Sequence, residues 1–120
     1  MKLLMRLLMA LVIGLSLSSA AGAGELSAPS DLSLRIEGKG FLLTWKSSSD
    51  DPGTVTGYVI ERSSAATGPF KVIARVKKGV QKYSDRTAKA ETIHYYRVRA
   101  VTGKESSAYS NTVTGELPGS

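Results

Sequence analysis

The chain has 120 residues, of which 42% are hydrophobic and 22% charged, a length and composition that suit one domain rather than a multidomain enzyme. It contains no cysteine and one histidine, His94, which excludes a disulfide framework, a thiol nucleophile and a multi-histidine metal site within the chain. Sixteen Lys and Arg against ten Asp and Glu give a formal net charge of +6, which suits an acidic partner if the positive charges converge.

Residues 1–23 have the pattern of a secretory signal peptide. Lys2 and Arg6 provide a positive start, residues 7–17 are apolar, and residues 18–23 are small, as a cleavage site requires. We expect cleavage after Ala23. A membrane anchor is disfavoured, because an apolar run of about a dozen residues is shorter than the roughly 20 that span a bilayer. The sequence therefore predicts an exported protein, in the periplasm, at the cell surface or in the medium, with no stable membrane insertion.

The rest of the chain is predicted to be all-β. Short runs alternate apolar and polar residues and are separated by Gly, Pro, Ser and Asp, which is typical of strands with one buried face. The seven predicted strands cover residues 32–36, 41–45, 58–62, 70–76, 81–85, 92–101 and 108–114. Seven short strands with frequent turns predict a two-sheet sandwich. We expect this domain at residues 30–115, after a short linker at 24–29 and before a tail at 116–120.

The alternation also predicts which side chains fill the space between the two sheets. Phe41, Leu43 and Trp45 share one face of the second strand, and Trp45 is large enough to bury about 200 Å² of aromatic surface. The predicted structural core comprises Trp45, Tyr58, Ile60, His94, Tyr96 and Val98.

Several short motifs occur in one order along the chain. They are Ala28-Pro29, Leu43-x-Trp45, Gly57-Tyr58-x-Ile60, Gly68-Pro69-Phe70, Tyr83-x-Asp85, and the segments 95–101 and 106–111. In this order and spacing they resemble a fibronectin type III domain, and more narrowly the type found in bacterial exported proteins. Export without cysteine also favours a bacterial protein, since small eukaryotic secreted domains often carry disulfides. The resemblance implies an immunoglobulin-like sandwich and an interaction role.

His94 departs from the pattern of that family. The family usually has a tyrosine at this position, whose hydroxyl binds the backbone of the preceding loop. We expect the His94 imidazole to replace it by donating one hydrogen bond to a backbone carbonyl. A Ser-His-Asp relay through His94 is the functional alternative, and it is disfavoured because no nucleophile motif surrounds this residue.

Other catalytic and cofactor sites find little support in the sequence. Asp50 and Asp51 are adjacent in the loop between the second and third strands, beside Pro52-Gly53, where such residues usually form turns. The same loop lacks the spaced acids of a calcium site. The glycines are scattered, without a phosphate-binding pattern. We therefore expect no enzyme activity, no cofactor, no metal and no nucleic-acid partner.

One outward face is the best candidate for binding. Glu61, Tyr95, Arg97 and Arg99 are predicted to lie close together on the third and sixth strands, with Arg62 and Lys71 as possible neighbours. Glu61 can pair with an arginine across the strands. Arginines beside an aromatic ring can stack on sugars or bind an acidic polymer, although a solvated face with cross-strand charge pairs is the simpler interpretation.

Three functions remain open from the sequence. The first is an exported, non-enzymatic module that contacts a protein or an envelope polysaccharide. The second, which the family resemblance implies, is an accessory polysaccharide-binding protein that works beside secreted carbohydrate-active enzymes. The third is a small hydrolase that uses His94.

Overall fold

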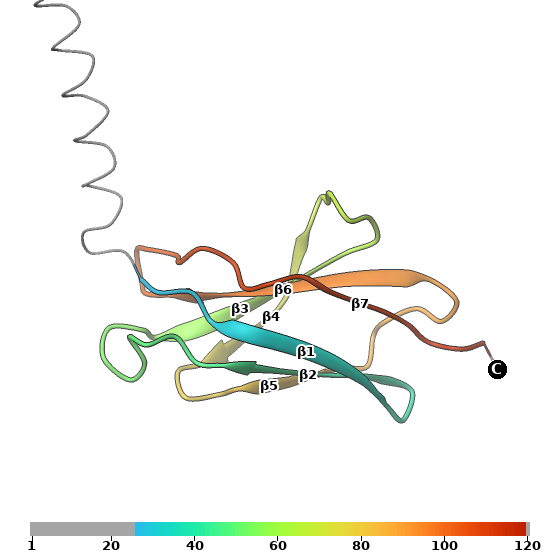
Figure 1. The fold of residues 1–120 in the computed structure, drawn as a ribbon, viewed down its shortest axis with the longest axis horizontal. Coiled ribbons are helices and arrows are strands. Elements are labelled where there is room, and N and C mark those ends of the chain that lie inside the picture. The colour runs from blue at the N-terminus through green and yellow to red at the C-terminus, as the bar shows by residue number, and fades with distance from the viewer. Residues whose placement is uncertain (1–25, 120) are drawn as a thin grey trace, which may run out of the picture.

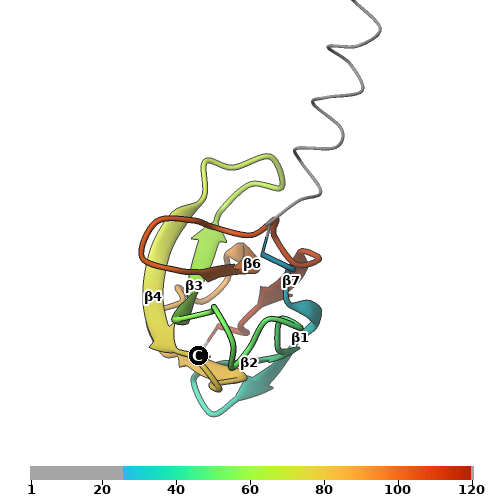
Figure 2. The same cartoon turned by 90° about the vertical axis from the view of Figure 1, so that its left-hand side faces the viewer.

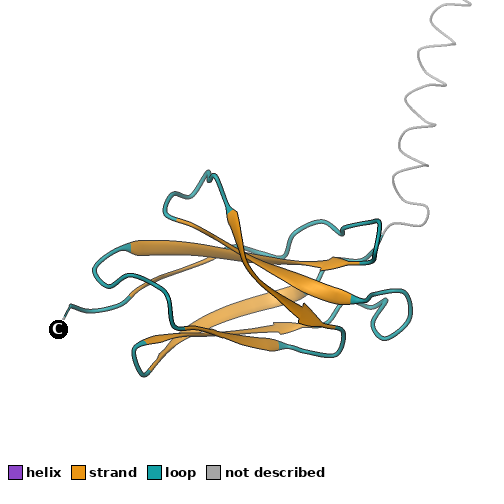
Figure 3. Ribbon diagram, turned by 180° about the vertical axis from the view of Figure 1, so that it is seen from behind, coloured by secondary structure: helices purple, strands orange, loops and turns teal. Residues whose placement is uncertain are grey.

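The computed structural model describes residues 26–119, so the predicted signal peptide at residues 1–23 lies outside the described part of the chain. This part consists of strands joined by turns and loops (Figure 3). Residues 26–119 contain no helix that is long and apolar enough to cross a membrane.

Seven strands form two antiparallel sheets (Figure 1). The strands are β1 (Ser30–Glu37), β2 (Gly40–Lys46), β3 (Gly57–Ser63), β4 (Lys71–Lys77), β5 (Lys82–Asp85), β6 (Ile93–Val101) and β7 (Val113–Glu116). One sheet has the order β1-β2-β5 and the other β4-β3-β6-β7. The two sheets face each other, as the view from one end shows (Figure 2). The predicted all-β, seven-stranded, two-sheet sandwich is confirmed.

Two glycines shape the start of β2. Gly38 has a φ of +62°, a left-handed conformation that glycine adopts without a steric penalty, and it turns β1 back into β2. A Cβ atom at Gly40 would collide with the backbone carbonyl of Asp85, so glycine lets β2 and the end of β5 approach closely. This approach brings Asp85 to the edge of the core.

The core lies between the sheets. Phe41 packs edge-on against Tyr96 with 5.8 Å between ring centroids, and Trp45 packs against Tyr58 at 5.9 Å. The residues predicted for the core from alternation, namely Trp45, Tyr58, Ile60, His94, Tyr96 and Val98, are all buried. Buried apolar side chains contribute about 25 cal/mol per Å² removed from water, so this layer is the main source of stability.

The packed domain extends beyond residues 30–115 at both ends. Leu26 and Leu117 belong to the same core cluster, with exposed fractions of 8% and 5%. Ser27 also donates its backbone N–H to the Asp50 carboxylate at 2.8 Å, which fastens the segment before β1 to the β2–β3 loop. Residues expected as linker and tail therefore complete the sandwich.

The last strand differs from the prediction of residues 108–114, since β7 is Val113–Glu116. Before it, the Ser107 and Ser110 hydroxyls accept hydrogen bonds from the backbone N–H groups of Ala100 and Val98, at 2.9 and 3.0 Å. Side-chain oxygens thus take positions that strand carbonyls would fill, and regular pairing starts later.

Candidate functional site

Strand β3 places two neighbouring charged residues on opposite faces. Tyr58 and Ile60 point into the core, and Arg62 follows them with the same parity, while Glu61 points outward. Arg62 was named as a possible neighbour of the outward face, and it does not lie there, because its guanidinium reaches the buried Asp85 carboxylate instead. Lys71 pairs in register with Arg62, and both residues line a surface hollow that is described below.

Glu61 is the centre of an outer cluster of charged and aromatic residues. Its side chain is almost fully covered, with the residue only 4% exposed. Arg97 approaches Glu61 Oε1 through Nε and Nη2, each at 2.9 Å. Tyr109 donates its hydroxyl to Oε2 at 2.9 Å, and Arg99 Nη2 lies 3.7 Å from the same oxygen. The expected pairing of Glu61 with an arginine across the strands is present.

Two aromatic rings complete the outer cluster, which we define as Glu61, Phe70, Arg97, Arg99 and Tyr109. The Arg97 guanidinium carbon lies 4.0 Å from the Phe70 ring centroid and 3.6 Å from that of Tyr109. Such cation–π contacts stabilise a guanidinium that is partly removed from water. Since rings already contact Arg97, a sugar ring finds no free guanidinium face there.

Tyr95 lies on the same face of β6 but outside these contacts. It is half-buried and pairs in register with Ser63 and Thr114. The rings that hold Arg97 are those of Phe70 and Tyr109, which the sequence did not indicate for this face. Both residues fall within the predicted strands 70–76 and 108–114, but in the structure they lie outside β4 and β7, so the predicted alternation does not describe where their rings point.

The outer face of the sheet β4-β3-β6-β7 carries an excess of positive charge. Arg75 and Lys77 are exposed on β4, and Arg75 pairs in register with Val59. Together with Arg97 and Arg99 they outnumber the carboxylates of Glu61 and of Glu116, which pairs in register with Ile93 on the same face. Burial, together with the hydrogen bond to Glu61, raises the pKa of Tyr109, so this phenol stays neutral and acts as a donor.

A second polar cluster, the inner network, consists of Arg62, Asp85, Thr87 and Tyr96. Asp85 is fully buried, and its Oδ2 accepts hydrogen bonds from Arg62 Nη1 at 2.7 Å and from the Tyr96 hydroxyl at 2.6 Å. Thr87 donates its backbone N–H and its hydroxyl to Oδ1, at 2.9 and 2.7 Å. Asp85 lies on β5, whereas Arg62 and Tyr96 lie on the other sheet, so the network ties the two layers together.

Hydrogen bonding decides the ionisation of the inner network. Burial alone would raise the pKa of Asp85, but the hydrogen bonds from Tyr96, Thr87 and Arg62 lower it overall. Burial and the Asp85 carboxylate both raise the pKa of Tyr96. Burial acts to lower the pKa of Arg62, and the contact with Asp85 outweighs this and raises it. The folded network therefore contains an ionised carboxylate, a charged guanidinium and a neutral phenol.

His94 occupies a structural position at the start of β6. It is 5% exposed, and its ring lies 6.2 Å from the Phe41 ring, measured between centroids. Nε2 donates a hydrogen bond to the carbonyl oxygen of Lys89 at 2.9 Å. The expected bond from the imidazole to a preceding backbone carbonyl is therefore present.

Asp50 and Asp51 hold the β2–β3 loop and the strands around it. Asp51 Oδ2 accepts hydrogen bonds from the Tyr58 hydroxyl and the Gly79 N–H, each at 2.8 Å. Burial and this hydrogen bond raise the pKa of Tyr58. Over residues 26–119, no group of three or more His, Cys, Asp or Glu side chains is placed to hold a metal ion.

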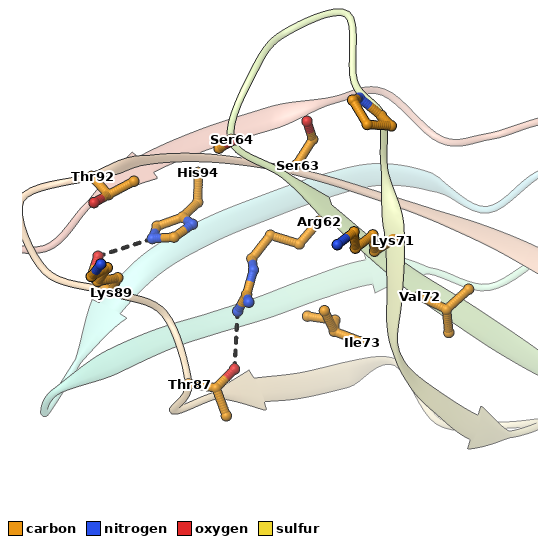
Figure 4. Close-up of a pocket in the computed structure, with 11 residues that line it drawn as sticks. Arg62, Ser63, Ser64, Lys71, Val72, Ile73, Thr87, Lys89, Thr92 and His94 are labelled. Atoms are coloured by element: carbon orange, nitrogen blue, oxygen red, sulfur yellow. Dashed lines mark hydrogen bonds between the residues drawn. The ribbon is translucent and has the colours of Figure 1, made fainter.

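A basic hollow of about 750 Å³ lies beside the inner network (Figure 4). Figure 4 shows Arg62 between His94 and Thr87, with Lys71 close to it and Lys89 on the far side of His94. The charged residues that line the hollow are all basic. The lining consists of Arg62, Ser63, Ser64, Pro69, Lys71, Val72, Ile73, Thr87, Lys89, Thr92 and His94.

Comparison with known proteins places this fold in a family. The family model of the fibronectin type III domain matches residues 27–116. An amylopullulanase from Thermoanaerobacter thermohydrosulfuricus is 40% identical over 78 residues, which make up 65% of this chain and only 5% of that protein.

Solved structures share the same architecture. A Fn3-like protein from Clostridium thermocellum superposes with a TM-score of 0.67 and 24% identity over 80% of this chain and 97% of that chain. The β-1,2-glucanase from Parabacteroides distasonis has a TM-score of 0.66 and 22% identity over 81% of this chain and 13% of that chain. At these identities the two structures show the fold alone. Because the family model covers most of its length, the chain belongs to the fibronectin type III family.

Proposed function

We propose that this chain is an exported, non-enzymatic interaction module that contacts an envelope polymer or a protein. The observation that carries the proposal is that the buried polar side chains hold the packed sandwich together. His94, Asp85 and Glu61 are each buried and each hold neighbouring groups in place. Their hydrogen bonds serve the fold, which favours a rigid binding surface over catalysis.

The outer face is suited to contact with an acidic partner. Glu61 and the two aromatic rings already occupy the Arg97 guanidinium, so Arg97 adds to the positive potential of this face without being a free contact. Exposed Arg75 and Lys77 on β4 add positive charge beside it. A surface of one sign attracts an oppositely charged partner and raises the rate of encounter.

A polysaccharide is the partner class that the comparisons favour. The relative with 40% identity is an amylopullulanase, and the matched segment is a small part of its length. One structural neighbour is a β-1,2-glucanase in which the same fold covers 13% of the chain. These proteins support the view that the domain accompanies proteins that act on polysaccharides.

A binding panel with matched variants tests this proposal. The chain without residues 1–23, which retains the whole core cluster, is exposed to neutral and acidic polysaccharides and, in parallel, to envelope extract. We expect retention by a polysaccharide, weakened in the double variant Arg75→Ala, Lys77→Ala. The control, Arg35→Ala with Lys39→Ala, removes the same charge from the β1–β2 hairpin and should bind as the native chain does. Turnover of any polysaccharide, or failure to retain any polymer or protein, contradicts the proposal.

A further inference from the structure

The basic hollow has a surplus of positive charge that the fold does not use. Asp85 offsets the charge of Arg62, but Lys71 and Lys89 are both exposed, and within residues 26–119 no carboxylate lines the hollow. The three cations come from the end of β3, the start of β4 and the β5–β6 connection. Segments far apart in sequence thus bring basic side chains to one concave place.

The Arg62 guanidinium is already oriented. Its Nη1 donates to Asp85 at 2.7 Å and to the Thr87 hydroxyl at 2.9 Å, and its side chain remains 24% exposed. A donor that is held by the protein before binding loses little freedom when a ligand arrives. A guanidinium carries five N–H donors, so the contacts of Nη1 leave donors for an anion in the hollow.

The hollow also has features that suit a sugar. Its volume of about 750 Å³ falls within the range of roughly 300–1,000 Å³ that small-molecule sites occupy. Ser64 and Thr92 contribute hydroxyl groups, and Val72 and Ile73 contribute apolar atoms to the lining, Val72 being 45% exposed. Sugar rings have both hydroxyl groups and apolar C–H faces, which match this mixed lining.

We propose that the basic hollow binds a negatively charged sugar unit of a polysaccharide, with its carboxylate or sulfate between Arg62, Lys71 and Lys89. This inference rests on the proposed function and names the ligand class and the site. The outer cluster is the weaker candidate for such a ligand, because Glu61 already binds its arginines and aromatic rings cover Arg97.

The test is a titration followed by the amide resonances of the chain, with four probes. Oligogalacturonate supplies a carboxylated sugar, a sulfated oligosaccharide supplies the other anion, maltohexaose supplies a neutral sugar, and inorganic phosphate supplies an anion without a sugar. We expect one or both acidic oligosaccharides to shift resonances of residues 62–64, 71–73 and 87–94. The comparison between the two acidic probes shows which anion the site prefers. Binding should weaken at higher salt, since exposed charges are screened.

Two double variants distinguish binding at the basic hollow from a general effect of the net charge on affinity. Lys71→Ala with Lys89→Ala should weaken binding of the acidic sugar by about tenfold or more, because each lysine removed costs a charge-assisted hydrogen bond. Lys82→Ala with Lys104→Ala lowers the net charge equally at exposed positions elsewhere and should leave affinity unchanged.

The inference is overturned by an equal loss of affinity in both variants or by the absence of shifts at the hollow with either acidic sugar. It is also overturned if maltohexaose or phosphate binds as tightly as the acidic sugars. If the Lys71, Lys89 variant still binds a polysaccharide as the native chain does, the site is wrong and the proposed function stands. If the native chain binds no polymer and no protein, the proposed function fails as well.

Discussion

Asp85 and Glu61 each bind an arginine and a tyrosine hydroxyl, but they do so in different places. Asp85 is fully buried and joins strands of two sheets through Arg62 and Tyr96. Glu61 joins neighbouring strands of one sheet. The partner arginines are similarly exposed, Arg62 at 24% and Arg97 at 27%, so the clusters differ in the strands that they join. The same chemical groups therefore lock the layers together in one region and organise a surface in the other. The cost of breaking each cluster should differ accordingly.

The largest effect is expected for Asp85→Ala. This change leaves the buried Tyr96 hydroxyl and the Arg62 charge without their common partner, and it should cost about 3 kcal/mol, the lower end for a broken buried ion pair, because the Arg62 side chain is 24% exposed. Urea unfolding followed by circular dichroism measures the change in the free energy of unfolding. The control is Glu37→Ala, since the Glu37 side chain is 48% exposed and its ion pair with Arg35 should contribute less than about 1 kcal/mol. A similar cost for the two variants would remove the distinction between buried and exposed carboxylates.

Removing the hydroxyl of Tyr96 or of Tyr109 should destabilise the domain less than Asp85→Ala, and the two variants can be compared directly. Tyr96→Phe removes a donor at 2.6 Å from the fully buried carboxylate and should destabilise the domain by about 2 kcal/mol. Tyr109→Phe removes a donor at 2.9 Å from Glu61, which keeps Arg97, and should cost about 0.5–1 kcal/mol. Urea unfolding of both variants shows which of the two lowers the free energy of unfolding more. A larger loss in Tyr109→Phe would mean that the outer cluster contributes more to stability than the inner network.

Glu61→Ala should destabilise the domain by about 1–2 kcal/mol. The variant loses the contacts with Arg97 and Tyr109, but Arg97 and Arg99 are partly exposed and can turn to water. Thermal unfolding measures this loss, and Arg97 should become more mobile in its side-chain resonances. If the cost reached that of Asp85→Ala, burial of the partners would not be the controlling factor.

The smallest expected effect is the acid dependence of the inner network. The pKa of Asp85 is lowered in the folded state, so the unfolded chain binds the proton more readily. The stabilisation is therefore present above the unfolded pKa, about 4 for aspartate, and is lost as the pH falls through the lower folded pKa. Urea midpoints of the native chain and of Asp85→Asn should converge below about pH 4. A constant difference down to about pH 2 would contradict this coupling.

The sequence predicted the sandwich because alternation reports burial directly. Tyr58, Ile60 and Arg62 share one parity on β3, so the signal that Arg62 points inward was present in the sequence. The prediction did not use that signal and named Arg62 as a possible neighbour of the outward face. The partner could not be foreseen, because Asp85 lies on the opposite sheet and meets Arg62 only after the sheets stack.

The irregular segments were less predictable. Phe70 and Tyr109 were assigned to the predicted strands 70–76 and 108–114 but lie in loops, and their contact with Arg97 depends on the paths of these loops. Asn111, just before β7, makes two side-chain hydrogen bonds with the backbone of Leu32 on β1. Its Oδ1 accepts from the Leu32 N–H at 2.8 Å, and its Nδ2 donates to the Leu32 carbonyl at 2.9 Å. An amide side chain here replaces a neighbouring strand, which alternation cannot reveal.

Trp45 is the only tryptophan of the chain, and it is 4% exposed beside Tyr58. An indole shielded from water fluoresces at a shorter wavelength than one in water, and a nearby phenol transfers excitation energy to it. Trp45 does not line the basic hollow, so its emission reports the integrity of the layer between the sheets rather than occupancy by a ligand. The domain thus carries its own optical probe, with which an unfolded variant can be told apart from one that has lost only its binding site.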